Sequence, residues 1–311
     1  MKQSGKTKRR VVGRDWKRTV FLCVFLAWPV LHWLVFSAYM NVQTVISSFQ
    51  LYNRFSGQME WVNFRNYEVF FEYLFSNNEG YGVAFGNIFV YIVFNIFVLL
   101  PVTIVIAYIF SRKFPGGGFF SAVYFFPCLI SVVIMTMSWS FMWDLDQGIF
   151  PLLLRAFGIK DPPGGYVGTY GQTIVLLYCF WVGIGWNNLL LGGAMHQVSP
   201  ELYEAAEIDG AGGTSKFFHV TLPSIWPTIS TLIILGVASS FTIFLQPQLI
   251  ANGEFGTITI ALIVVQKVVD AGDVGLSAAI GVMLGIFGLI IVFLLKKGLN
   301  YVDRRLGYAE G

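Results

Sequence analysis

The stretch from Glu204 to Pro227 reads EAAEIDGAGGTSKFFHVTLPSIWP, and the interpretation of the whole chain starts from it. These residues are polar and charged, yet long apolar segments precede and follow them. A polar segment of this length between apolar segments indicates a loop that meets something outside the bilayer, because loops commonly carry binding functions.

Local signals predict a short helix at the start of this loop. Ser199 is a good N-cap, and Pro200 suits the first helical position. Asp209-Gly210 is expected to stop the helix, since glycine tolerates the left-handed conformation that closes a helix C-terminus.

A second helix is predicted after a glycine turn. It begins at Thr214 or Ser215, and Pro223 ends it. Residues 199–227 are therefore expected to form a helix–Gly–helix element.

The exposed tip of that element has the chemistry of a docking surface. Small Ala205 and Ala206 let a partner's backbone approach closely, while Glu204 and Asp209 offer charge for specific pairing. From the residues alone, a loop that merely packs under the helix bundle explains the segment equally well.

The composition places the rest of the chain in a bilayer. Hydrophobic residues make up 56% of the 311 residues and charged residues only 12%, against about 25% in soluble domains. A spanning helix needs about 20 apolar residues, and six stretches of at least 22 residues carry no Asp, Glu, Lys or Arg. Six transmembrane helices are predicted, at residues 19–41, 85–110, 119–143, 170–193, 227–250 and 275–296.

A seventh apolar run, residues 257–269, is short and contains Lys267. We expect it to be an interfacial or re-entrant piece. The outer segment 42–84 carries interleaved aromatic residues. It is expected to lie at the interface as a loop or to form a small cap that contacts an extracellular partner.

The distribution of lysine and arginine predicts the orientation, because cytoplasmic segments carry an excess of both. With six spans and the N-terminus inside, 15 of the 20 Lys and Arg residues lie on the inner side. The prediction is a cytoplasmic tail at 1–18, a transmembrane region at 19–300 and a cytoplasmic tail at 301–311, in a cell membrane. The basic N-terminal tail is interpreted as a topology signal that meets anionic lipid, not as a nucleic-acid site.

The loop resembles the EAA loop of ABC importer permeases, in Glu204-Ala205-Ala206, Asp209-Gly210-Ala211 and Leu222-Pro223. That resemblance implies an all-α polytopic membrane protein of the type I importer permease class. It also implies that a cytoplasmic ATPase subunit docks on the loop. The coupling residues carried over are Glu204, Ala205, Ala206, Asp209, Gly210, Leu222 and Pro223.

Residues 85–300 look like the first (F-type) permease subunit of the carbohydrate branch, notably in Tyr124-Phe125-Phe126-Pro127, Ile130-Ser131 and Trp139. The resemblance implies a second homologous permease, two ATPase subunits and an extracytoplasmic binding protein that delivers a sugar. Gly210 to Lys216 is only faintly like a phosphate-binding loop, since Ser215 precedes Lys216 and Phe217 follows it. ATP and Mg²⁺ are therefore expected in the partner subunits, with no cofactor, metal or catalytic site in this chain.

A neutral sugar needs aromatic platforms and hydroxyl or amide partners. The predicted spans carry no acid or base, whereas ion-coupled carriers and pumps usually need one. Each candidate for the substrate path has helix packing or interfacial anchoring as its alternative. The candidates are Ser131, Trp139, Trp181, Ser239, Ser240 and Gln246.

Other functions remain as alternatives. The same importer could carry a polyamine, an amino acid or a polyol phosphate, for which intramembrane carboxylates or a basic cluster would be expected. An intramembrane protease would need a Ser–His or metal-ligand set, yet His32 is the only histidine in a predicted span. A stand-alone channel or carrier does not account for the EAA-like loop.

Overall fold

The computed structural model describes residues 16–53, 58–76, 80–112, 116–269 and 272–306. The predicted N-terminal tail lies almost wholly outside these residues, as do residues 307–311 of the C-terminal tail. The described chain is mainly helical, as predicted, with one exception in the outer segment.

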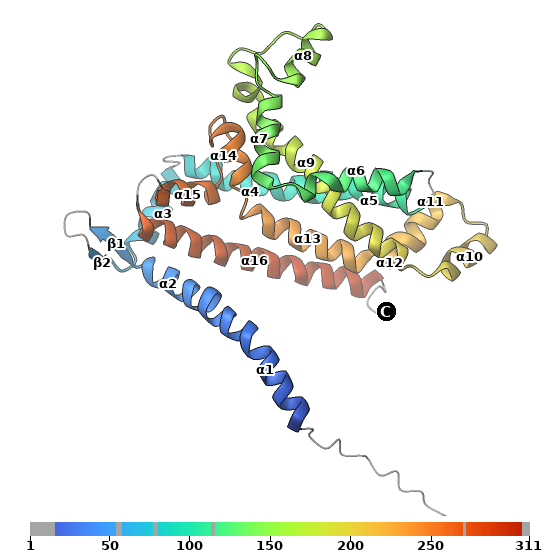
Figure 1. The fold of residues 1–311 in the computed structure, drawn as a ribbon, viewed down its shortest axis with the longest axis horizontal. Coiled ribbons are helices and arrows are strands. Elements are labelled where there is room, and N and C mark those ends of the chain that lie inside the picture. The colour runs from blue at the N-terminus through green and yellow to red at the C-terminus, as the bar shows by residue number, and fades with distance from the viewer. Residues whose placement is uncertain (1–15, 54–57, 77–79, 113–115, 270–271, 307–311) are drawn as a thin grey trace, which may run out of the picture.

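The first apolar helix stands apart from the body of the molecule (Figure 1). An 18-residue apolar window within its 30-residue stretch, Arg18–Ser47, has no buried residue in this chain, whereas Ser47 at the end of the stretch is buried. At this far end α2 packs on α16. The helix is built from α1 (Trp16–Trp33), the π-helical turn η1 (Leu34–Tyr39) and α2 (Met40–Ser47).

The outer segment 42–84 folds into a small cap. After α2 come two antiparallel strands, β1 (Gln50–Asn53) and β2 (Gln58–Trp61), and then α3 (Arg65–Ser76). Asn66 fixes the cap, because its buried side chain donates hydrogen bonds to the carbonyls of Ser48 and Gln50, each at 2.9 Å. This hairpin is an exception within the helical fold, and it pairs by backbone hydrogen bonds that the apolar pattern does not encode.

Three long helices form the frame of the body, and α5 and α6 both pack against α9. A methyl group at Gly185 would lie only 2.2 Å from the Tyr124 carbonyl oxygen, so glycine is what lets α6 and α9 approach so closely. The frame helices are Tyr81–Ser111 (α4, Tyr81–Phe94; η3, Asn95–Leu99; α5, Leu100–Ser111), α9 (Gly165–His196) and α16 (Val274–Leu306).

The expected helix at 119–143 is two helices, α6 (Gly117–Leu129) and α7 (Val132–Met142), bent by 101°. Ile130 and Ser131 have extended backbone angles, ψ 147° and 130°, which interrupt the helical hydrogen bonds. The one continuous helix predicted there was therefore wrong, although the bent pair can still form one span. Beyond α7, the chain continues into α8 (Ile149–Ala156), which projects from the body (Figure 1).

The expected helix at 227–250 also divides. α13 (Trp226–Ser240) ends before a turn, and α14 (Leu245–Ala251) follows separately. Pro247 has no backbone N–H for a helical bond to the Ile243 carbonyl, and that carbonyl accepts the Thr259 hydroxyl at 2.7 Å instead. The prediction of one continuous helix was wrong for this reason.

Residues 257–269 contain the short apolar helix α15 (Ile260–Val269), in line with the prediction that this run is too short to span. Among the described residues, four helices are long and apolar enough to cross a membrane uninterrupted. The number reaches six when each bent pair, α6 with α7 and the loop helices with α13, is taken as one span.

Candidate functional site

The first helix of the polar loop forms as the sequence predicts. It is α10 (Pro200–Ile208), with Ser199 at the cap position and Pro200 in the first turn. Ser199 makes no capping hydrogen bond through its side chain. The helix ends at Asp209, and Gly210 follows with a φ of +76°, the left-handed stop expected there.

The second helix differs from the prediction at both ends. It begins at Gly213 as α11 (Gly213–Lys216) and continues through a π-helical stretch, η4 (Phe217–Thr221), into α12 (Leu222–Ser224). Pro223 does not end it, because proline is tolerated in the first turn of α12. The break comes at Ile225, where the loop helices bend by 67° into α13.

The surface of α10 offers both charge and an apolar side chain. Glu204, Ala205 and Asp209 are exposed, as expected of the tip, whereas Ala206 is half-buried. Ile208 is 87% exposed, although sequence reasoning did not select it. Ile208 is the aliphatic residue between Glu204-Ala205-Ala206 and Asp209-Gly210, and this position in a polar stretch is the sequence feature that could have identified it.

The two predicted coupling residues at the far end of the loop have a different place. Leu222 is half-buried and packs on the inner core cluster formed by α5, α9 and α13. Pro223 is also half-buried. These residues connect the loop to the bundle and do not belong to the exposed surface of α10.

Two side-chain contacts join α10 to the second helix. The Lys216 Nζ lies 2.5 Å from Glu207 Oε1, and the Tyr203 hydroxyl lies 2.9 Å from Thr221 Oγ1. The hydrogen bond and charge of Lys216 hold the pKa of the Glu207 carboxyl below its usual value.

The loop is also tied to the bundle. The Tyr108 hydroxyl on α5 donates a hydrogen bond to the Gly213 carbonyl at 3.0 Å, and its ring lies 4.6 Å from that of Phe217. At the start of α13, the Trp226 indole N–H donates to the Asp303 carboxylate on α16. Figure 1 places the loop helices and the end of α16 at one end of the body, with the cap at the other.

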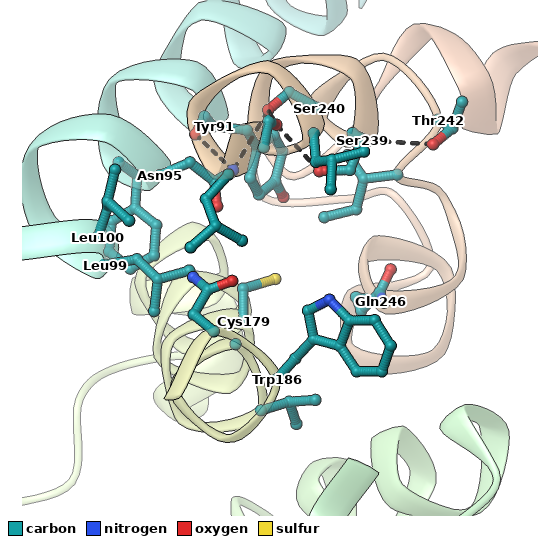
Figure 2. Close-up of a pocket in the computed structure, with 18 of the residues that line it drawn as sticks. Tyr91, Asn95, Leu99, Leu100, Cys179, Trp186, Ser239, Ser240, Thr242 and Gln246 are labelled. Atoms are coloured by element: carbon teal, nitrogen blue, oxygen red, sulfur yellow. Dashed lines mark hydrogen bonds between the residues drawn. The ribbon is translucent and has the colours of Figure 1, made fainter. Parts of the chain in front are cut away.

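An open cavity of about 480 Å³ lies between α4–η3, α9, α13 and α14. This volume lies in the range of small-molecule sites. Figure 2 shows Asn95, Ser239 and Ser240 on one side of the space, with Trp186 and Gln246 opposite. Every residue that lines it in the described chain is uncharged. The polar and aromatic lining residues are Tyr91, Asn95, Tyr178, Trp186, Asn187, Ser239, Ser240, Thr242 and Gln246.

Half of the predicted substrate-path residues line this cavity, namely Ser239, Ser240 and Gln246. Ser239 is exposed and Gln246 half-buried, whereas Ser240 is only 3% exposed. The other three residues do not line it.

Trp139 and Trp181 stack on each other with ring centroids 5.5 Å apart, inside a core cluster of α7, α9 and α14. The Trp139 indole N–H also donates to the Ile174 carbonyl at 3.2 Å. Neither ring is among the residues that line the cavity, so a part for these two residues in the substrate path stays a prediction. Ser131 lies at the break between α6 and α7, outside the cavity lining.

Asn95 and Trp186 line the cavity but were not chosen as candidates from the sequence, whereas Asn187 was expected to line the exit or to cap a helix. A polar amide inside an otherwise apolar helix is the signal that would have selected Asn95. Asn187 showed the same signal, whereas the adjacent Asn188 is buried on another side of α9.

Residues 83–308 match the family model described as binding-protein-dependent transport system inner membrane component. The arabinooligosaccharides transport system permease protein AraP of Halalkalibacterium halodurans is 27% identical, over 86% of this chain and 82% of that protein. The diacetylchitobiose uptake system permease protein NgcF of Streptomyces coelicolor is 25% identical, over 99% of this chain and 89% of its own length.

A chain in the crystal structure of a bacterial ABC transporter involved in the import of the acidic polysaccharide alginate has the same fold. The TM-score is 0.78 at 18% identity, with 94% of this chain and 97% of that chain covered.

Proposed function

This chain belongs to the family of binding-protein-dependent transport system inner membrane components, and from that membership we propose that it is the first permease subunit of an ATP-driven sugar importer. It is a multi-pass membrane protein of a transport family and not an enzyme. The observation that carries the choice of cargo is the uncharged, hydroxyl- and amide-lined cavity at α9 and α13.

The chemistry of that cavity suits a mono- or oligosaccharide. Hydroxyl, amide and indole groups match the hydroxyls and the apolar faces of a sugar ring. Asn95, Asn187 and Gln246 supply amide donors and acceptors, and Trp186 supplies an aromatic platform. The arabinooligosaccharide and diacetylchitobiose permeases among the relatives support the same choice.

The cavity is open, which leaves room for a partner chain to supply further wall. A second homologous permease would complete the translocation path. An extracytoplasmic binding protein would deliver the sugar, and two ATPase subunits would hydrolyse ATP with Mg²⁺.

The ATPase would dock on α10. Glu204, Ala205 and Asp209 are exposed there beside Ile208, so the surface combines charge with an apolar side chain that a groove could enclose. This assignment puts the loop and both termini in the cytoplasm, in agreement with the excess of lysine and arginine on that side.

The same importer carrying a polyamine, an amino acid or a polyol phosphate is the second candidate. A cationic or anionic cargo would be favoured by charged groups in its binding site. The described lining of the cavity has none.

The test is uptake by proteoliposomes that contain this chain with its partner permease, ATPases and binding protein. Arabinooligosaccharides and diacetylchitobiose are the sugar panel, with spermidine, glutamine and glycerol phosphate as the competing cargoes. ATP-dependent uptake of one of the sugars alone is expected. Uptake of a charged solute without any sugar would overturn the proposal.

A further inference from the structure

Lys216 lies in an environment where a lysine needs a partner. Lys216 is 8% exposed, and its Nζ lies 2.5 Å from Glu207 Oε1. A buried ammonium group is costly unless it is paired. Glu207 lies on α10 and Lys216 on α11, so this pairing joins two helices that the glycine turn would otherwise leave loosely connected.

The turn between these helices does not by itself fix their relative orientation. Asp209 to Gly213 contains three glycines, and neither Gly212 nor Gly213 would bring a Cβ within 4 Å of another part of the molecule. Glycine allows more backbone conformations than other residues. Rigidity at this point must therefore come from side chains that cross the turn.

Two polar side-chain contacts span the turn in the described chain, and they lie about one helical turn apart along the second helix. Glu207 pairs with Lys216, and Tyr203 pairs with the fully buried Thr221. Thr221 Oγ1 also donates to the Lys216 carbonyl at 3.4 Å. The two contacts with α10 are therefore made by residues that are themselves bonded to each other in the α11–η4 segment. Two separated contacts restrict rotation of α10 about the turn, which a single contact would permit.

We propose that Lys216 is a positioning residue that makes α10 and the α11–η4 segment one rigid body. A displacement of α10 by an ATPase subunit would then move α12 and α13, and with them the cavity wall at Ser239. The inference rests on the proposed function. Lys216 would transmit the movement of α10 to the bundle, whereas the exposed face of α10 would bind the ATPase, so the two roles are separate.

Docking and transmission can be separated because they depend on different residues. Ile208 and Glu204 are exposed, whereas Lys216 is buried, so replacing Lys216 leaves the exposed apolar and acidic groups in place. Removal of the pair should therefore leave ATPase association intact and lower the amount of solute moved per ATP hydrolysed.

The experiment compares Lys216→Met, Glu207→Gln and the charge exchange Glu207→Lys with Lys216→Glu in the assembled complex. Methionine keeps the apolar stem that packs in this position. ATPase co-purification, ATP hydrolysis and solute uptake are measured together. Glu201→Gln, an exposed glutamate on the same helix, is the matched control.

Each single variant is expected to bind the ATPase normally and to lose about fivefold or more in uptake per ATP, the lower end of typical coupling between sites. The charge exchange should restore at least part of that ratio, which a loss of folding would not do. An unchanged ratio in Lys216→Met would overturn the inference, and so would loss of ATPase association.

Lys216→Arg is the alternative variant if Lys216→Met prevents assembly, because arginine keeps the positive charge. Its ratio should lie near that of the unmodified chain, and a ratio as low as that of Glu207→Gln would contradict the proposal. The ratio is measured with whichever solute of the panel the unmodified complex imports. A wrong choice of sugar therefore leaves this test intact.

Discussion

Asn95 and Ser240 join the π-helical turn η3 to α13 across the edge of the cavity. The Asn95 Nδ2 donates to Ser240 Oγ at 3.3 Å and to the Tyr91 carbonyl at 3.0 Å, and Ser240 Oγ donates to the Gly236 carbonyl at 2.8 Å. Figure 2 shows these bonds beside Ser239. Ser240 is thus part of the wall, while the exposed Ser239 is the better position from which to fill the space.

Ser239→Trp is therefore expected to occupy the cavity and stop uptake while the complex still assembles. Ser239 is exposed, and its hydroxyl donates only to the Gly236 carbonyl of its own helix among the bonds found. Thr231→Trp, at an exposed position of α13 outside the cavity lining, is the matched control. Uptake is measured beside ATPase activity, and normal uptake in Ser239→Trp would place the translocation path elsewhere.

Gly210→Val should misdirect α10 and lower both ATPase association and uptake. Gly210 has a φ of +76°, and a β-branched residue in this left-handed conformation costs about 1–2 kcal/mol. Gly212→Val is the control, since Gly212 has a φ of −70° and open space at its Cβ. Equal activity of the two variants would show that the left-handed stop is not needed for coupling.

Ile208→Asp and Glu204→Lys test the docking surface. An exposed isoleucine that fills a pocket on a partner contributes about 2 kcal/mol or more when it is a central contact. Reversing the charge at Glu204 would place like charges together, which costs several kcal/mol. Both variants should insert in the membrane but bind the ATPase at least tenfold more weakly in a pull-down titration, whereas Ile208→Leu should bind normally.

The orientation is tested by cysteine labelling. A cysteine at Gly213 should resist a membrane-impermeant maleimide in intact cells, while one at the exposed Lys160 should react. Strong labelling at both positions would contradict a cytoplasmic loop. The native Cys23, Cys128 and Cys179 are first replaced by alanine to remove background reaction.

Asn87→Leu should destabilise the segment between α14 and α15. The Asn87 Nδ2 donates to the carbonyls of Gly256 and Ile258, both at 2.7 Å, and the residue is 7% exposed. Both hydrogen bonds are part-buried, and a typical hydrogen bond within a protein contributes about 0.5–1.5 kcal/mol. Thermal unfolding in detergent should show a lower midpoint than for Asn41→Leu, whose amide is exposed.

The features that could be predicted from the amino-acid sequence are those that depend on local chemistry. Uncharged windows identify apolar helices because a bilayer excludes unpaired charge. The start of α10 at Pro200 and its stop at Gly210 follow from backbone preferences that need no distant neighbour. The same local residues carried the resemblance on which the family was first inferred.

The positions where the apolar helices break, and the pairs of polar residues that meet, depend on tertiary contacts. A span that is apolar on all sides has no periodic pattern to distinguish a cavity face from a packed face. Ser239 and Trp139 therefore looked alike in sequence, yet one faces the cavity and the other stacks on Trp181. The pairing of Lys216 with Glu207 likewise depends on how the glycine turn folds back, because the energy of an ion pair depends on the distance and burial of both partners.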